Sequence, residues 1–178
     1  MKNIQSKLQN DLRTALKGRR KLEVSTLRLL GAAIINKEKE KRIKIARSEK
    51  DLKEEELVEK SRLTDEEIIE VVLSEIKKRK EAILGFSAGS VSAPASEKAK
   101  IQNLIDKEKE EIKILKKYLP EQLSEEEVRK LAKDVVEKTK AQSMKDIGKV
   151  MKKLMPKIKG KADGSLVSKI VKELLTPR

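Results

Sequence analysis

Apolar residues recur at helical spacing along almost the whole chain. Ile4, Leu8 and Leu12 fall on one helical face, and similar spacing predicts a second helix from about Lys21 past Asn36. No segment alternates apolar and polar residues as a half-buried strand would. The pattern therefore predicts an all-α fold. Its persistence argues against a disordered chain, which would not keep such spacing.

Two long helices are predicted in the middle of the chain. Thr64 and Glu67 form a capping-box pattern, in which each side chain can bond the other residue's backbone N–H, and open the first helix. Residues 85–94, rich in Gly, Ser and Ala, predict a break, and a second helix is expected over about 95–118. The two helices would pair as an antiparallel hairpin. A shorter apolar pattern predicts a short helix around 52–58.

A domain boundary is predicted at Pro120, because the residue before a proline is disfavoured in the α region and a helix ends there. Residues 1–120 would form an N-terminal helical domain with the long hairpin. Residues 121–178 would form a small C-terminal domain of three helices.

Polar capping residues predict where those three helices begin. Ser124, followed by three glutamates, opens the first. The second is expected to begin at Ser143 and to stop at Pro156, since proline disrupts a helix interior. Asp163 is expected to cap the third.

The composition of the 178 residues excludes several kinds of chemistry. The chain has no Cys, no His and no Trp, so a thiol nucleophile, a disulfide, a Cys-ligated zinc and an imidazole base are all ruled out. With one Tyr and one Phe, RNA modules that stack bases on paired aromatic residues are not expected. We predict no catalytic residue, no metal site and no cofactor.

Charge divides the chain into basic and acidic regions. The net charge is +14, from 44 Lys and Arg against 30 Asp and Glu. Residues 1–47 have a net charge of +10, residues 48–75 of −7 and residues 121–178 of +6. Basic regions of this kind concentrate polyanions such as nucleic acids. The alternative is that these residues are solvated faces of ordinary helices.

One lysine-rich segment in the C-terminal part is a candidate phosphate-binding site. Its first lysines follow a spacing of i, i+4 and i+7 or i+8, with either Lys152 or Lys153 as the last, and so fall on one helical face. Later lysines alternate in what should be an extended loop after Pro156, and the next helix directs free N–H groups toward that loop. The candidate residues are Lys145, Lys149, Lys152, Lys157, Lys159, Lys161 and Lys169, with Gly160 and Gly164 allowing the backbone to approach a phosphate.

The residues also allow a purely structural interpretation of this segment. The two glycines would serve a tight turn, Asp163 would be an ordinary N-cap and the lysines would be solvated. From the residues, neither interpretation is favoured over the other.

Two blocks of sequence resemble the GatB/YqeY family. Residues 118–127 resemble its interdomain junction, and residues 146–151 with 155–167 resemble its most characteristic motif. The resemblance spans nearly the whole chain. It departs from the family at 36–63, which is longer and more charged, and at 85–94, which is richer in Ser and Ala.

This resemblance implies a relative of the helical tail domain of GatB, the B subunit of aspartyl/glutamyl-tRNA amidotransferase, which holds the tRNA. It suggests association with a carbon–nitrogen ligase activity that uses glutamine as amido-N-donor, but the residues offer no site for ATP, ammonia or an activated carboxylate. We therefore expect a non-catalytic accessory protein that binds tRNA or another structured RNA. The resemblance also suggests two possible protein partners, the amidotransferase and an aminoacyl-tRNA synthetase. The alternatives are an amidotransferase component and a helical scaffold for an acidic protein.

A cytoplasmic location without membrane binding is expected. The N-terminal segment has no unbroken apolar run of the kind that signal peptides contain. The longest apolar candidate, residues 27–35, is far shorter than the roughly 20 residues a membrane span needs.

Overall fold

The computed structural model describes residues 3–91, 93–141 and 143–176. Every regular element in these ranges is helical, which confirms the predicted all-α class. Contacts divide the chain into two compact units, Met1–Tyr118 and Leu119–Arg178, here called the N-terminal unit and the C-terminal unit. That each folds as an independent domain stays a prediction. Among the described residues, none of the helices has both the length and the apolar character that crossing a bilayer requires.

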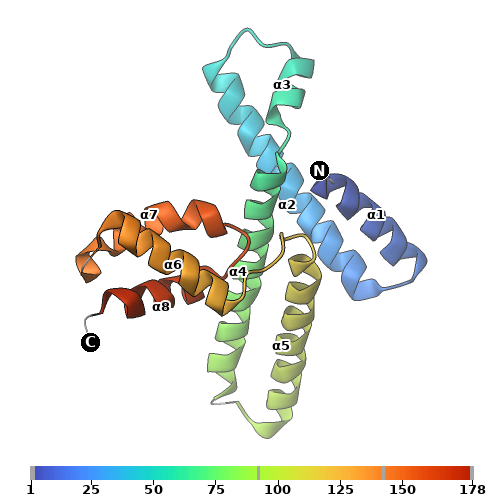
Figure 1. The fold of residues 1–178 in the computed structure, drawn as a ribbon. Coiled ribbons are helices and arrows are strands. Elements are labelled where there is room, and N and C mark those ends of the chain that lie inside the picture. The colour runs from blue at the N-terminus through green and yellow to red at the C-terminus, as the bar shows by residue number, and fades with distance from the viewer. Residues whose placement is uncertain (1–2, 92, 142, 177–178) are drawn as a thin grey trace. The chain divides into compact units, whose positions relative to one another are not determined.

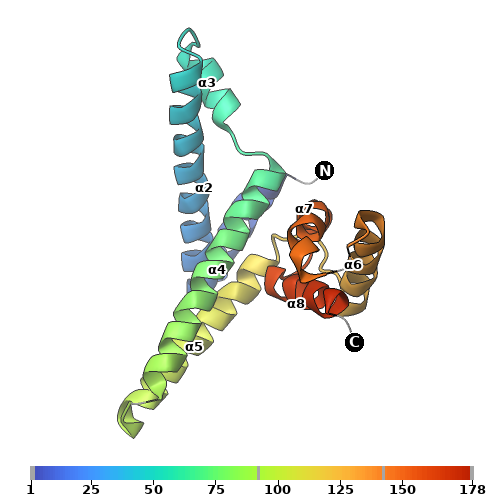
Figure 2. The same cartoon turned by 90° about the vertical axis from the view of Figure 1, so that its left-hand side faces the viewer.

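The N-terminal unit is built around a long helix and a helical hairpin. In Figures 1 and 2, α4 and α5 run side by side. Helix α2 packs against both of them, and α1 and α3 each pack against α2. The elements of the described part are α1 (Ile4–Lys17), α2 (Lys21–Ser48), α3 (Glu54–Ser61), α4 (Asp65–Ser90) and α5 (Ala95–Lys116).

The apolar side chains buried in this unit are aliphatic apart from one aromatic residue, Tyr118. Leu30 of α2, Ile68 of α4 and Leu115 of α5 are each at most 1% exposed. Tyr118, which follows α5, is 4% exposed, and its hydroxyl donates a hydrogen bond of 2.7 Å to the Asp11 carboxylate on α1. Burial, and then this bond, raise the pKa of the Tyr118 hydroxyl above its ordinary value. The bond ties the end of α5 to α1.

The hairpin confirms the predicted pair of helices but has a shorter turn than expected. The Thr64 hydroxyl accepts from the Glu67 backbone N–H at 3.3 Å, and the Glu67 carboxylate accepts from the Thr64 N–H at 2.8 Å. The predicted break over 85–94 is wrong for residues 85–90, because α4 continues to Ser90. Glycine and serine only weaken a helix, by at most about 1 kcal/mol each. Pro94, which lacks an N–H, is the N-cap of α5.

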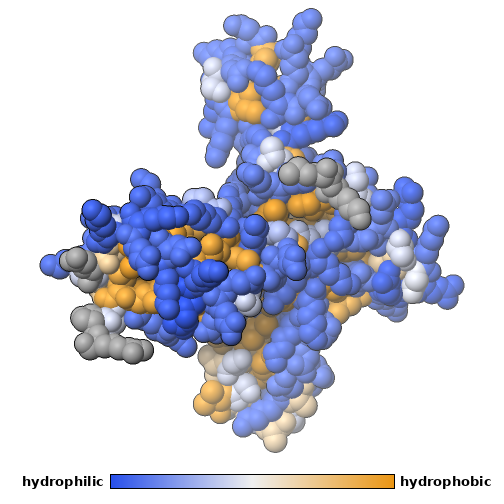
Figure 3. All heavy atoms as spheres, viewed as in Figure 1, coloured by the Kyte–Doolittle hydropathy of each residue, from blue (hydrophilic) through white to orange (hydrophobic). Residues whose placement is uncertain are grey.

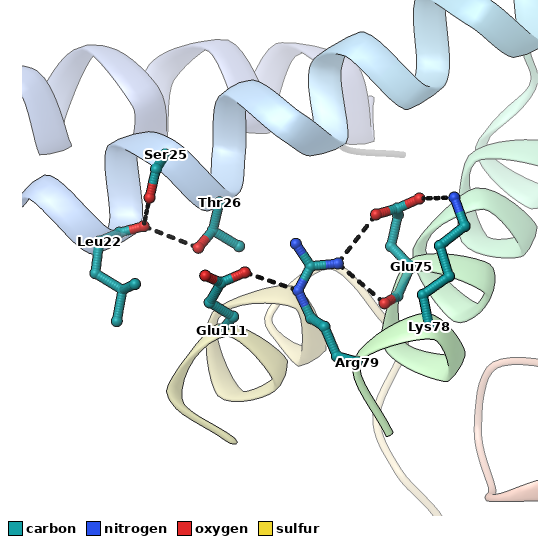
Figure 4. Close-up of polar contacts among 7 residues, drawn as sticks. All are labelled: Leu22, Ser25, Thr26, Glu75, Lys78, Arg79 and Glu111. Atoms are coloured by element: carbon teal, nitrogen blue, oxygen red, sulfur yellow. Dashed lines mark hydrogen bonds and ion pairs between the residues drawn. The ribbon is translucent and has the colours of Figure 1, made fainter. Parts of the chain in front are cut away.

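Three ionised side chains are buried where α4 packs on α5 (Figure 4). Arg79 is 7% exposed, Glu75 8% and Glu111 6%. The Arg79 guanidinium donates to Glu111 on α5 at 2.8 Å and to Glu75, one turn earlier on α4, at 3.0 Å. Lys78 donates to the other oxygen of Glu75 at 2.6 Å. We call Glu75, Arg79 and Glu111 the buried ion cluster.

Burial alone would raise the pKa of Glu75. Hydrogen bonds from Lys78 and Arg79 more than offset that effect and leave the pKa below its ordinary value. Arg79 is also the last buried residue of α4, so the rest of that helix, residues 80–90, lies outside the core.

The C-terminal unit packs three α-helices around an entirely aliphatic core. Helices α6 (Glu125–Thr139), α7 (Ile147–Ile158) and α8 (Gly164–Leu175) contact one another, and the short 3₁₀ helix η1 (Met144–Asp146) precedes α7. The buried side chains in its described part are Val128, Ala132, Val135, Val150, Leu154, Ile158, Val167, Ile170, Val171 and Leu175.

The second helix of this unit opens where predicted but ends later. Ser143 is the N-cap residue of η1, which leads directly into α7, although its hydroxyl bonds the Asp146 carboxylate at 3.4 Å and no backbone N–H. Pro156 does not stop α7, which continues to Ile158. Leu154 and Ile158, one turn apart, are both buried in the core. Their burial stabilises a last turn that proline alone would disfavour.

Candidate phosphate-binding surface

Helix α7 separates its apolar and basic side chains onto opposite faces. Val150, Leu154 and Ile158 face the core and are at most 1% exposed. Because their burial fixes how α7 is rotated about its axis, the lysines between them face solvent, while Met151 packs against the edge of the core. We call the exposed lysines of η1 and α7 the α7 lysine face; they are Lys145, Lys149, Lys152, Lys153 and Lys157.

Few carboxylates neutralise the α7 lysine face. The Lys149 ammonium lies 3.1 Å from the Asp146 carboxylate, but the Lys149 side chain is 75% exposed, so salt and water weaken the pair. The other four lysines make no ion pair or hydrogen bond through their side chains with any residue that the structure describes. The face therefore presents positive charge to solvent. Figure 3 shows hydrophilic side chains over much of the visible surface of this unit.

Gly160 forms the turn after α7 and is covered rather than open. It is buried and has φ of 74°, a left-handed conformation that favours glycine. Its carbonyl accepts a 2.6 Å hydrogen bond from the Gln122 side chain, and the Lys161 carbonyl accepts one of 2.7 Å from the Leu123 N–H. The structure thus gives Gly160 a conformational role and does not expose it to a phosphate.

The start of α8 is occupied by its own cap. The Asp163 carboxylate accepts from the Ser165 backbone N–H at 2.8 Å, which confirms the predicted N-cap. Gly164 is exposed, and a Cβ at that position would meet no atom within 4 Å. An anion approaching this helix end would meet the negative charge of Asp163 first. The geometry favours the capping interpretation here over phosphate binding.

The lysines after Pro156 do not lie in an extended loop, so that prediction is wrong. Lys157 is in the last turn of α7, because the helix continues past Pro156. Lys159 is the residue that ends the helix, and Lys161 lies in the turn that follows. Both are exposed. Lys159 and Lys161 add positive charge beyond the end of the α7 lysine face. They do not continue its helical spacing, because they lie outside the helix.

Lys169 belongs to a different helix. It lies in the middle of α8, beside a shallow hollow that Lys172 and Glu173 also line. The Glu173 carboxylate pairs with Arg129 of α6 at 2.8 Å. The structure therefore brings the lysines of α7 together and leaves Lys169 on a separate helix.

Lys153 belongs to the basic face together with Lys152, although the sequence spacing alone makes the two lysines alternatives. It is exposed, and its spacing of i+4 from Lys149 is the signal that marks it. Within the described ranges, no three Asp or Glu residues gather as metal ligands would. A row of flexible ammonium groups suits a chain of phosphates, which it can contact as point charges without a fixed geometry.

Comparison with protein-family models indicates the family of the chain. No curated protein matches the chain. The protein-family model described as Yqey-like protein matches residues 35–175. That span covers well over half of the 178 residues and contains α3 to α8 whole, including the α7 lysine face. The chain therefore belongs to the YqeY-like protein family.

Proposed function

We propose that this protein is a non-catalytic RNA-binding accessory protein, directed to tRNA or another structured RNA. The α7 lysine face contacts the phosphate backbone. The observation that carries the proposal is the opposition on α7 between three buried aliphatic residues and five exposed lysines, four of which lack a carboxylate partner among the described residues. The packing of the buried residues fixes the orientation of α7, and so keeps the lysines on its solvent-facing side.

The expected mode of recognition is by backbone and shape. Lysines that neutralise phosphates release condensed counterions, so the affinity falls steeply as salt rises. Base stacking needs exposed aromatic side chains, and this chain has only Phe86 and the buried Tyr118. The resemblance to the tail of GatB supports tRNA as the RNA. Association with a glutamine-dependent amidotransferase rests on that resemblance alone and is not required.

A filter-binding titration of tRNA at several salt concentrations tests the proposal. The variant Lys149→Gln/Lys152→Gln/Lys153→Gln removes three charges from the face without touching the core. If each lysine contacts one phosphate, the slope of log K against log salt falls by roughly 2 to 3. A matched control, Lys50→Gln/Lys53→Gln/Lys60→Gln, removes the same charge from the acidic region and should bind like the unchanged protein.

Two results contradict the proposal. Absence of tRNA binding at low salt removes the RNA-binding function. Equal weakening by both triple variants shows that net charge, and not the α7 lysine face, governs binding.

A further inference from the structure

Helix α1 ends in an unusual version of a common turn. The Arg19 N–H donates to the Leu16 carbonyl at 3.2 Å, and the Arg20 N–H donates to the Ala15 carbonyl at 3.0 Å. These two bonds define a Schellman motif, whose residue with positive φ is usually glycine. Here that residue is Arg19, with φ of 51°, although Gly18 immediately precedes it with φ of −80°.

This placement points to a role for the arginine side chain beyond folding. A left-handed conformation is unfavourable for a residue with a Cβ atom, and glycine avoids that strain. The chain has a glycine at the neighbouring position and does not use it there. Strained backbone of this kind is often found where a side chain is needed for binding.

Positive charge gathers at the same turn. We call residues 17–21 the α1–α2 corner; four of its five residues are basic, and all five are exposed. Arg20 pairs with Glu23 at 2.8 Å. The side chains of Lys17, Arg19 and Lys21 make no ion pair or hydrogen bond with any residue that the structure describes. The family match begins at residue 35, so this corner lies outside it.

We propose that the α1–α2 corner is a second contact site for the phosphate backbone of the RNA, with Arg19 as its central cation. The inference rests on the proposed function and extends it from the C-terminal unit to the N-terminal unit. The guanidinium group suits this role because its planar array of donors can bond two phosphate oxygens at once. Two sites on one chain would raise the affinity for a structured RNA that spans both.

The variant Arg19→Gly separates a binding role from a structural one. It removes the cation and places glycine at the position with positive φ, so the melting temperature should rise or stay unchanged. If Arg19 contacts a phosphate, tRNA affinity falls several-fold at low salt, and the slope of log K against log salt falls by about 0.7 to 0.9. Arg19→Lys keeps the charge and should bind close to the unchanged protein.

Lys140→Gly provides a matched control. Lys140, with φ of 52°, is the other residue besides glycine that has positive φ in the described chain. The substitution relieves the same strain and removes the same charge, but it lies in the C-terminal unit at the end of α6. Its melting temperature should likewise rise or stay unchanged, and its tRNA binding should change little.

The outcomes distinguish this inference from the proposed function. Weaker binding by Arg19→Gly but not by Lys140→Gly supports the corner, even if the α7 triple variant binds normally. Unchanged binding by Arg19→Gly, or equal weakening by the two glycine variants, overturns the corner while leaving the α7 lysine face standing. No tRNA binding by the unchanged protein removes both. Arg19-dependent binding of poly-glutamate without tRNA binding overturns the RNA assignment in favour of an acidic protein.

Discussion

In the N-terminal unit three ionised side chains lie in the interior, whereas the buried side chains in the described part of the C-terminal unit are all aliphatic. Both units are rich in charged residues, so composition alone does not explain the contrast. In the N-terminal unit, the ion pair of Arg79 with Glu111 joins α4 to α5. In the other, charge stays on the surface, where the α7 lysine face is available to a ligand. The comparison teaches that a charged position near a helix seam can serve packing or binding, and that burial distinguishes the two.

Of the changes considered, breaking the buried ion cluster should lower the free energy of unfolding most. Arg79→Met leaves Glu75 and Glu111 buried without their shared cation, and removing one partner of a buried pair costs about 3–5 kcal/mol. Urea unfolding followed by the fluorescence of Tyr118 measures the loss. Because Tyr118 is the single Tyr and the chain has no Trp, this signal reports on the N-terminal unit.

Lys77→Met is the control for that measurement. It removes a charge from the same helix, but the Lys77 side chain is 77% exposed and its pair with Glu81 is long, at 3.8 Å. A change of no more than about 0.5 kcal/mol is expected. If Arg79→Met were equally mild, the cluster would not be holding α4 on α5.

A smaller loss of stability is expected when the pH is lowered. The pKa of Glu75 is lowered in the folded protein, so its contribution to stability is complete above the ordinary value of 4.5 and is lost as the pH falls through the lowered pKa. The urea midpoint of the Tyr118 signal should therefore fall as the pH is taken from 6 toward 3. Glu75→Gln should reduce that dependence, since the group no longer titrates.

The C-terminal unit gives the comparison for the acid experiment. The pKa of Glu127 is also lowered, by hydrogen bonds from Ser124, but this carboxylate is on the surface. Circular dichroism, which reports on both units, should show a later and shallower acid transition than the tyrosine signal does. Coincident transitions would mean that the buried cluster does not set the acid sensitivity.

The smallest change in stability should come from substitutions in the last part of α4, residues 80–90. Gly85 and Gly89 lie inside this helix, and a Cβ at either would meet no atom within 4 Å. Gly85→Ala and Gly89→Ala should each add helicity and stabilise the hairpin by up to about 1 kcal/mol. Figure 3 shows apolar surface at this end of the hairpin, where Leu84 is 69% and Val91 83% exposed.

Helicity by circular dichroism and the urea midpoint measure this gain. Gly18→Ala is the contrasting change, since a Cβ there would lie 3.3 Å from the Arg20 side chain and 3.4 Å from the Thr14 carbonyl. Gly18→Ala should raise the helicity and the urea midpoint less than the other two substitutions do. Loss of helicity in Gly85→Ala would show that residues 85–90 are a turn, as the sequence pattern predicts.

Local signals were sufficient where one interaction decides the structure. The capping boxes at Thr64 and Ser124 place the starts of α4 and α6, because a side-chain oxygen and its backbone partner are only three residues apart. The lysine spacing on α7 also predicts most of the candidate surface, because residues three or four apart share a helical face. Local signals were misleading at Pro156 and at residues 85–90, where residues that weaken a helix lie inside one.

The order of apolar and polar residues along the chain was enough to determine an all-α fold, because helical periodicity and capping act over a few neighbouring residues. Only the tertiary structure decided which charges are buried in a pair, as at Arg79, and which face solvent, as on α7. It also showed that Gly160 is covered while Arg19 is held in a strained turn. The physical reason is that desolvation depends on side chains distant in sequence, as Glu111 is from Arg79.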